Sequence, residues 1–425
     1  MSKRVFSLTA ILVVASMLLT ACGGGGGGGG AAVTLKIVSS LPMTGASLTQ
    51  TQTIVNAEKL RLEQAGGKAC GGKYNVVYEA WDDASAALGK WDPAVETENA
   101  NKAASDSTIV AYLGTFNSGA AKLSIPILNQ AGPLVMISPA NTYPGLTHSA
   151  TGLTEADEPG KYYPSGARNY ARVAATDDFQ GPVAVNFMLS EGIKSLYVLN
   201  DQEVYGKGVA DSVAQAATAK GMNVIANEGY DPKAADYKAL MTKISTSNAG
   251  GPPDAVYLGA VVDNNAAQIL KDKVAIMGDN TKVKFVGPDG IFTAALIEGA
   301  GASVAEGVFA TTPGLALKDL GEAGKKFYTD YEAKYGPTKE PYAIMGYDAM
   351  NAALKGIEDA CAAGADPADN KAFRAAVTKA VFAIKDFDGA LGKWSFDANG
   401  DITLPYFVVG QIQNGAYVDF GTFTP

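Results

Sequence analysis

Short apolar runs recur along most of the chain and are separated by longer, more polar stretches. Apolar residues occupy consecutive positions in these runs, a pattern that indicates strands buried on both faces of a parallel sheet. The runs are too short for helices of ordinary length. The expected strands are Leu35–Ser39, Asn75–Glu79, Ile109–Leu113, Leu134–Ile137, Ser195–Leu199, Asn223–Ala226, Ala255–Leu258 and Lys284–Val286.

The stretches between these runs have helical periodicity. Gly206–Lys220 carries Val209 and Val213 on one face, and two long helical patterns follow late in the chain at Glu322–Tyr335 and Tyr342–Ala362. Strands that alternate with helices predict βαβ units. We therefore expect an α/β fold built on doubly wound parallel sheets.

The expected strands form two series rather than one. The first series ends near Ile137, a stretch rich in Gly, Pro and Tyr covers Pro139–Arg168, and the second begins near Asp178. Two Asn-Gly pairs in the tail, Asn399-Gly400 and Asn414-Gly415, favour tight hairpins. A chain of this length suits two lobes better than one core.

The N-terminus has the pattern of an export signal. Lys3 and Arg4 precede an apolar segment, and small residues lead to Cys22, so residues 1–21 are predicted to be a signal peptide. The segment resembles the bacterial lipobox, which implies lipidation of Cys22; an ordinary signal peptide followed by an incidental cysteine is the alternative. The glycine run at 23–30 makes residues 22–32 a flexible tether. The expected location is the outer face of the cytoplasmic membrane or the periplasm.

Composition argues against several function classes. The chain has 43 acidic and 34 basic side chains, a net charge of −9, which disfavours nucleic acid as a partner. A single histidine, His148, excludes histidine metal clusters, and no phosphate-binding or nucleophile motif is present. We expect neither an enzyme nor a metal or cofactor protein. Cys70 and Cys361 either pair in an oxidising compartment or remain free thiols.

Four segments together carry a family resemblance. The segments are Ala111–Ser118, Met136–Thr147, Asp201–Gly208 and Phe285–Gly290. In this order they resemble the type I periplasmic binding proteins of the leucine/isoleucine/valine-binding group.

The resemblance implies two lobes joined by three crossovers, with a ligand in the cleft between them. The crossovers are expected near Arg172–Thr176, Phe309–Thr312 and Gly389–Lys393. Lobe 1 would then hold residues 33–172 and 312–388, and lobe 2 residues 174–310 and 391–425.

The resemblance also implies a set of ligand-binding residues. Ser118 opens a helix, where free N–H groups suit a carboxylate, although a plain helix cap is the alternative. Ala140 and Thr142 would contact a carboxylate or an ammonium, or else serve the turn around them. Tyr205 would line the cleft, with core packing as the alternative. Asp289 replaces the glutamate usual in the family and would bind an ammonium, with a turn role as the alternative.

Departures from the family concern the region around the ligand side chain. Phe116 and Asn117 replace the family's pair there, and Gln50 replaces an aromatic residue. The resemblance thus implies the substrate-binding protein of an ABC importer, a monomer that delivers a small amino-acid-like ligand to a membrane permease. A sensory receptor component, or a binder of an amide-like or urea-like solute, is the alternative.

Overall fold

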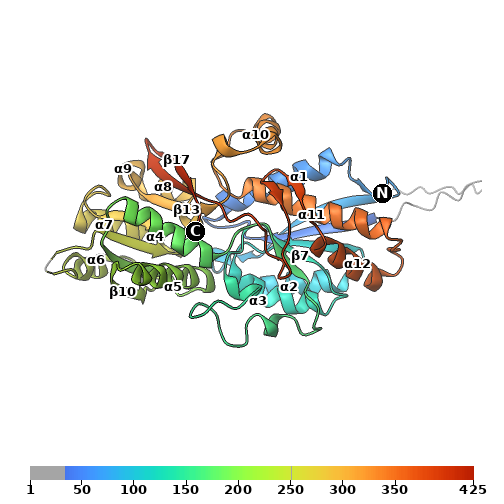
Figure 1. Ribbon diagram of the computed structural model, residues 1–425, viewed down its shortest axis with the longest axis horizontal. Coiled ribbons are helices and arrows are strands. Elements are labelled where there is room, and N and C mark those ends of the chain that lie inside the picture. The colour runs from blue at the N-terminus through green and yellow to red at the C-terminus, as the bar shows by residue number, and fades with distance from the viewer. Residues whose placement is uncertain (1–33, 250) are drawn as a thin grey trace, which may run out of the picture.

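Two α/β lobes lie side by side in the computed structural model, which describes residues 34–249 and 251–425 (Figure 1). Each lobe is organised around one sheet. The predicted signal peptide, the tether and Cys22 lie outside the described residues. Within the described ranges, no helix combines the length and apolar character that crossing a membrane requires.

Lobe 1 is built on a six-stranded sheet with the order β2-β3-β1-β6-β7-β8. All pairings are parallel except that of β2 with β3. The strands are β1 (Thr34–Leu41), β2 (Lys68–Ala69), β3 (Tyr74–Asp82), β6 (Ile109–Gly114), β7 (Met136–Ser138) and β8 (Tyr170–Arg172).

Helices cover both faces of this sheet, as a doubly wound fold requires. Ile37 and Ala111 join a core with α1, α11 and α12, whereas their neighbours Val38 and Tyr112 join a core with α2 and α3. The alternation explains why the strands are apolar on consecutive positions. The helices of the lobe are α1 (Leu48–Gln64), α2 (Pro93–Ser105), α3 (Ser118–Asn129), α10 (Glu322–Tyr335), α11 (Ala343–Ala362) and α12 (Asn370–Phe382), and short hairpins form from β4 (Ala84–Ser85) with β5 (Lys90–Trp91) and from β14 (Phe387–Gly389) with β15 (Gly392–Trp394).

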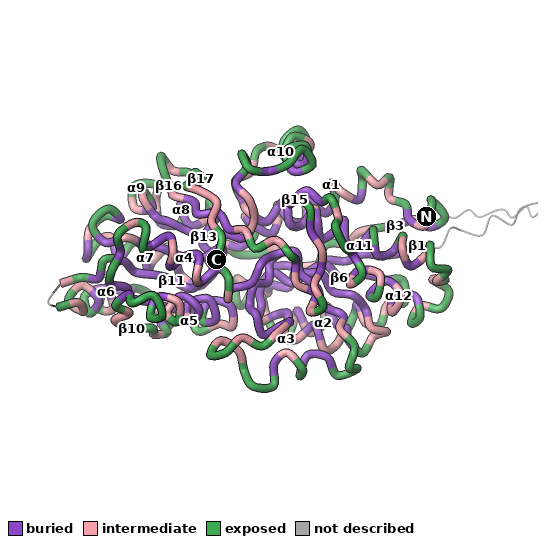
Figure 2. The backbone as a smooth tube through the Cα atoms, in the orientation of Figure 1, coloured by how far each residue is buried: buried purple, intermediate pink, exposed green. Residues whose placement is uncertain are grey.

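Lobe 2 repeats the plan on a seven-stranded sheet of order β10-β9-β11-β12-β13-β16-β17, whose last two strands are antiparallel. Asn414-Gly415 turns between those two strands, as predicted. Both sheets are buried, and the outer helix faces are exposed (Figure 2). The elements are β9 (Ser195–Asn200), β10 (Asn223–Gly229), β11 (Ala255–Gly259), β12 (Lys284–Gly287), β13 (Phe309–Pro313), β16 (Phe407–Gln413), β17 (Ala416–Phe423), α4 (Asp177–Ser190), α5 (Val204–Ala219), α6 (Lys238–Ser245), α7 (Ala266–Met277), α8 (Ala294–Ala300) and α9 (Ala302–Ala305).

The chain crosses between the lobes three times. The first crossing joins β8 to α4 through residues 173–176, inside the predicted span. The second follows Pro313 rather than lying at Phe309–Thr312, because β13 stays paired with β16 as far as Pro313 and Phe407.

The third crossing also lies later than predicted. Residues 389–393 belong to the β14–β15 hairpin, and Trp394 and Phe396 then pack into the core of lobe 1 together with Ile402. These large apolar side chains hold the chain in lobe 1 until shortly before β16. Residues 391–402, expected in lobe 2, are therefore part of lobe 1.

A disulfide ties distant parts of lobe 1 together. Cys70 and Cys361 are bonded, with their Cα atoms 5.5 Å apart. Cys70 lies in the turn between β2 and β3, and Cys361 lies in the last turn of α11. The bond connects residues 291 positions apart and closes a loop that includes all of lobe 2 except its last two strands.

A network of charges holds the hinge between the lobes. The fully buried Arg172 of β8 donates through Nε to Asp401 Oδ1 at 2.6 Å. His148, from the long loop after β7, lies 3.0 Å through Nδ1 from Asp401 Oδ2 and 3.1 Å through Nε2 from Asp178 Oδ2 on α4. Both of these partners can only accept, so both imidazole nitrogens must carry hydrogen. The arrangement requires a charged histidine between lobe 1 and lobe 2.

We expect His148 to be protonated at neutral pH. The hydrogen bonds with Asp178 and then Asp401 raise the pKa of His148 from 6.5 to about 9, against the opposing effect of burial. Because the pKa is higher in the folded state, this contribution to stability is complete below pH ~6.5 and is lost as the pH rises through about 9. The pKa difference corresponds to about 3 kcal/mol.

The pKa of His148 can be measured without assignment of other imidazole signals, because the sequence contains only one histidine. An NMR titration of the imidazole should give a midpoint near 9. The free-energy difference in unfolding between the wild type and His148→Gln should also shrink between pH 6.5 and pH 10. A midpoint near the ordinary 6.5 would show that the network does not hold the charge.

Candidate functional site

The sequence-predicted site residues lie on loops at the carboxyl ends of strands from both lobes. Ser118 follows β6, Thr142 follows β7, Tyr205 follows β9 and Asp289 follows β12. In open α/β sheets, this edge is where ligands bind. Tyr342, next to α11 of lobe 1, donates its phenol hydrogen to Asp289 Oδ2 of lobe 2, so the lobes are closed on each other at this point.

Further contacts join the lobes away from this point. The backbone N–H groups of Ala46 and Ser47 in lobe 1 donate to Asp263 Oδ1 in lobe 2 at 2.6 and 3.0 Å. Lys90, at the β4–β5 hairpin, forms an ion pair with Glu203 at the start of α5. Both contacts join a loop or hairpin of lobe 1 to lobe 2.

Lobe 1 contributes the start of α3 and the loop after β7. Ser118 is the first residue of α3, and the capping position belongs to Asn117, which makes no side-chain cap hydrogen bond. Ser118 Oγ accepts only a long hydrogen bond, 3.4 Å, from the backbone N–H of Tyr143. Thr142 is fully buried, yet its hydroxyl has no partner. Ala140 directs its N–H to Ser138 Oγ at 3.1 Å.

Phe116 contributes an apolar wall to the same part of lobe 1. It is buried, and its ring meets that of Tyr342 edge to face, with centroids 5.7 Å apart. Tyr342 thereby connects the α3 loop with Asp289. Of the residues predicted in lobe 1, Ser118, Asn117 and Thr142 retain free hydrogen-bonding capacity.

Lobe 2 contributes Tyr205 and Asp289. The phenol oxygen of Tyr205 accepts from the backbone N–H of Gly290 at 2.8 Å, which fixes the turn that carries Asp289. A Cβ at Gly290 would lie 2.8 Å from the Tyr205 ring, so this position requires glycine. Asp289 Oδ1 is buried and has no partner. Tyr205 thus positions Asp289.

Asp177 is a site residue that the sequence analysis missed. It is the first residue of α4, it is fully buried, and neither of its carboxylate oxygens has a hydrogen-bond partner. Acidic residues are common in the first turn of a helix, so nothing in the sequence singled out Asp177. Tyr257 of β11 adds a buried phenol oxygen that also lacks a partner. Tyr342 was missed as well, because its contact with Asp289 crosses between the lobes.

The two carboxyl groups disfavour each other's charge. Burial raises the pKa of Asp177, and the neighbouring Asp289 raises it further. Burial also raises the pKa of Asp289, against the opposing hydrogen bond from Tyr342. Among the described residues, neither carboxyl group forms an ion pair. Such a pair can hold two buried negative charges only beside a cation, and that cation would have to come from outside the protein.

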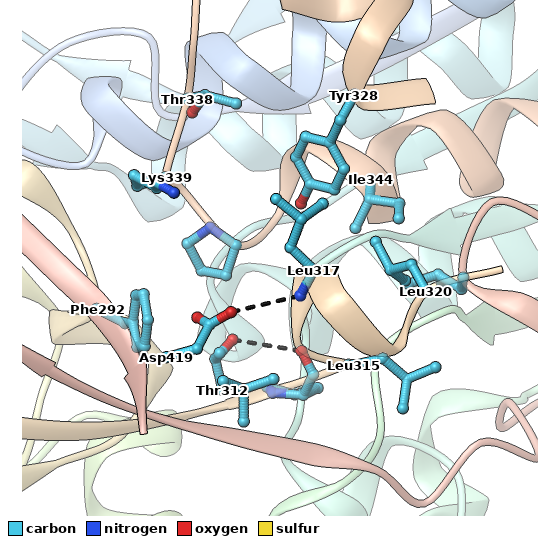
Figure 3. Close-up of a pocket in the computed structure, with 15 residues that line it drawn as sticks. Phe292, Thr312, Leu315, Leu317, Leu320, Tyr328, Thr338, Lys339, Ile344 and Asp419 are labelled. Carbon is cyan, nitrogen blue, oxygen red and sulfur yellow. Dashed lines mark hydrogen bonds between the residues drawn. The ribbon is translucent and has the colours of Figure 1, made fainter. Parts of the chain in front are cut away.

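A separate small pocket lies at the hinge (Figure 3). Its volume is about 90 Å³, and it lies between the second crossing, α10 and the segment before α11. Asp419 Oδ2 accepts from the N–H of Leu317 at its floor, at 3.3 Å. None of the predicted ligand-binding residues lines this pocket. The candidate site is instead the buried group of polar side chains between the closed lobes.

The chain is similar to known proteins over most of its length. The family model described as "Periplasmic binding protein" matches residues 34–416. A Leu/Ile/Val-binding protein of Rhizobium johnstonii is 26% identical over 378 residues, which cover 89% of this chain and 91% of that protein. A leucine-, isoleucine-, valine-, threonine- and alanine-binding protein of Pseudomonas aeruginosa is 27% identical, covering 87% and 88%.

A solved structure has the same fold. The crystal structure of a leucine-binding protein from Thermotoga maritima matches with a TM-score of 0.75 at 24% identity, covering 92% of this chain and 99% of that one. With the family model matched over nearly all the described residues, the chain belongs to the periplasmic binding protein family.

Proposed function

We propose that this protein is the extracytoplasmic substrate-binding component of an ABC importer and that it captures a small amino-acid-like zwitterion between its lobes. The observation that carries the proposal is the pair of buried carboxyl groups, Asp177 and Asp289, that have no cationic partner. The relatives named for branched-chain amino acids support the same ligand class.

The two charges of a zwitterion fit opposite parts of the site. An ammonium group would satisfy Asp289 Oδ1 and the two oxygens of Asp177, which are acceptors only. A carboxylate would lie at the start of α3, where Ser118 and the free N–H groups of the first turn favour negative charge. The hydroxyl of Thr142 can serve either group. The protein performs no covalent step in this scheme.

Closure follows from the same groups. In an open form, water hydrates the two carboxylates, and closing without ligand leaves them buried and mutually repelling. A bound cation removes that cost, so the ligand shifts the population toward the closed form. The closed form would then dock on a membrane permease. Cys22, if lipidated, would keep the protein at the membrane surface.

A sensory role is the second candidate, since receptors reuse this fold. Ligand capture and closure would be identical in both roles, and only the membrane partner would differ. Co-purification with a permease supports transport, and co-purification with a histidine kinase supports sensing.

A thermal-shift panel tests the ligand class. A true ligand at about 100 times its dissociation constant should stabilise the protein by ~2.7 kcal/mol. We expect shifts from amino acids that carry both charged groups. Matched analogues of leucine that lack one group, 4-methylpentanoate and 3-methylbutylamine, should give none. If benzoate or another carboxylate without an ammonium stabilises the protein while no amino acid does, the proposal is refuted.

A further inference from the structure

Gln50 is a buried polar side chain that the capture of a zwitterion leaves unexplained. It lies in the first turn of α1 and is fully buried between the lobes. Its Nε2 donates to the backbone carbonyl oxygens of Asp289 at 3.1 Å and Phe292 at 3.3 Å, both in lobe 2. Gln50 therefore lies against the same turn that carries the ammonium-binding carboxylate.

The orientation of the Gln50 amide is determined by these contacts. Both neighbours are carbonyl oxygens, which only accept, so the amide must present its NH₂ group to them. Its Oε1 then faces away from the lobe 2 turn, and it is buried without a partner. A buried acceptor without a hydrogen bond has lost its contact with water and gained no partner in return, which is unfavourable. The atom needs a donor that the protein does not supply.

Asn117 has the same property on the other side of the site. It directly precedes Ser118, it is buried, and its Oδ1 also lacks a partner. Gln180 Oε1, on α4 of lobe 2, is a third buried amide oxygen without a partner, so three neutral amide oxygens accompany the two carboxyl groups. All unpartnered buried side-chain atoms in the described residues are oxygens, and none is a nitrogen donor. Of these atoms between the lobes, only the hydroxyls of Thr142 and Tyr257 carry a hydrogen that they can donate, so the acceptors outnumber the donors.

The acceptors exceed what one amino-acid head group can satisfy. An ammonium supplies three N–H donors, and the unpartnered oxygens of Asp177 and Asp289 already number three. No donor of the head group remains for Gln50 Oε1 or Asn117 Oδ1. A ligand with a branched alkyl side chain would leave both amide oxygens buried without a hydrogen bond. A site with such unpaired groups binds that ligand much more weakly than one that supplies the missing donors.

We propose that the ligand is an amino acid whose side chain ends in neutral N–H donors, a carboxamide or ureido group, and that Gln50 determines this preference together with Asn117. The acceptors are amides rather than carboxylates, so a neutral donor matches them and a second positive charge is not required. This inference rests on the proposed function, since it assumes the zwitterion head group in the same site.

The experiment compares glutamine, citrulline and leucine by isothermal titration with the purified protein. We expect glutamine or citrulline to bind at least tenfold more tightly than leucine. In Gln50→Leu, the binding of the preferred ligand should weaken at least tenfold while leucine binding is unchanged or tighter. Gln52→Leu is the matched control, because Gln52 lies on the same helix and its Nε2 bonds only to Asn56.

Asn117→Ala provides a second variant that does not alter the contact between Gln50 and lobe 2. It should also reduce the preference for the amide-bearing ligand over leucine. Wild-type protein that binds leucine more tightly than every amide-bearing or ureido-bearing amino acid would overturn the inference and leave the proposed function standing. Equal weakening of all ligands in both variants would also overturn the inference. The amides of Gln50 and Asn117 would then stabilise the closed form without selecting the ligand side chain. Failure of every amino acid to bind would instead refute the proposed function.

Discussion

Replacement of Asp289 by asparagine is expected to weaken amino-acid binding by about tenfold to a hundredfold. The variant keeps the size of the side chain and removes the charge that an ammonium would meet. A charge-assisted hydrogen bond contributes about 1.5–3 kcal/mol, which sets this range. Isothermal titration, or the loss of ligand-induced thermal stabilisation, measures the effect.

The same variant should make the ligand-free protein more stable at neutral pH. Burial raises the pKa of Asp289, so its ionisation costs stability as the pH rises through the folded-state pKa. Asparagine removes that cost and the repulsion of Asp177. Asp359→Asn, in an exposed ion pair on α11, is the control; it should leave the affinity unchanged and alter the stability by at most about 0.5 kcal/mol. Unchanged affinity in Asp289→Asn would remove this residue from the site.

Replacement of Asp401 by asparagine is expected to lower the free energy of unfolding by about 3–5 kcal/mol. The change leaves the guanidinium of Arg172 without its carboxylate partner in a fully buried position. Removing one partner of a buried ion pair has an effect of this size. Chemical denaturation measures it.

A second readout separates this effect from a general loss of packing. Asp401 is also a partner of His148, so the pKa of the imidazole should fall toward 6.5 in Asp401→Asn. The exposed pair of Asp359 with Lys355 is again the control, and Asp359→Asn should cost at most about 0.5 kcal/mol. A loss of less than about 1 kcal/mol in Asp401→Asn would show that the hinge does not depend on this pair.

Most of the fold could be predicted from the sequence, because buried parallel strands leave a strong local signal. All eight expected strands are present, and the predicted helix at Glu322–Tyr335 has the same bounds in the structure. The third crossing was misplaced because nothing local shows that Trp394 and Phe396 pack backward into lobe 1. Local patterns determine elements, whereas the lobe that receives a segment depends on distant partners.

The site was predictable only where the residues belong to motifs. Ser118, Thr142, Tyr205 and Asp289 were predicted through four segments in order, and the loops that carry them lie at the carboxyl ends of strands in both lobes. Asp177 was not predicted, because an acidic residue at the start of a helix is usually explained by its favourable interaction with the helix N-terminus. Tyr342 and Gln50 escaped because their roles arise from contacts between lobes, 53 and 239 residues from Asp289 in the chain.

The interleaved chain path has a consequence for how the protein is made. The face of the first sheet that bears Ile37 and Ala111 is covered by α11 and α12, which end at Ala362 and Phe382. A nascent chain that has just completed β8 holds the six strands of this sheet, with α1 alone on that apolar face. Lobe 1 therefore cannot mature ahead of lobe 2 during synthesis, in contrast to proteins whose domains fold in N-terminal to C-terminal order. Fragments cut at either lobe boundary should be insoluble rather than independently folded.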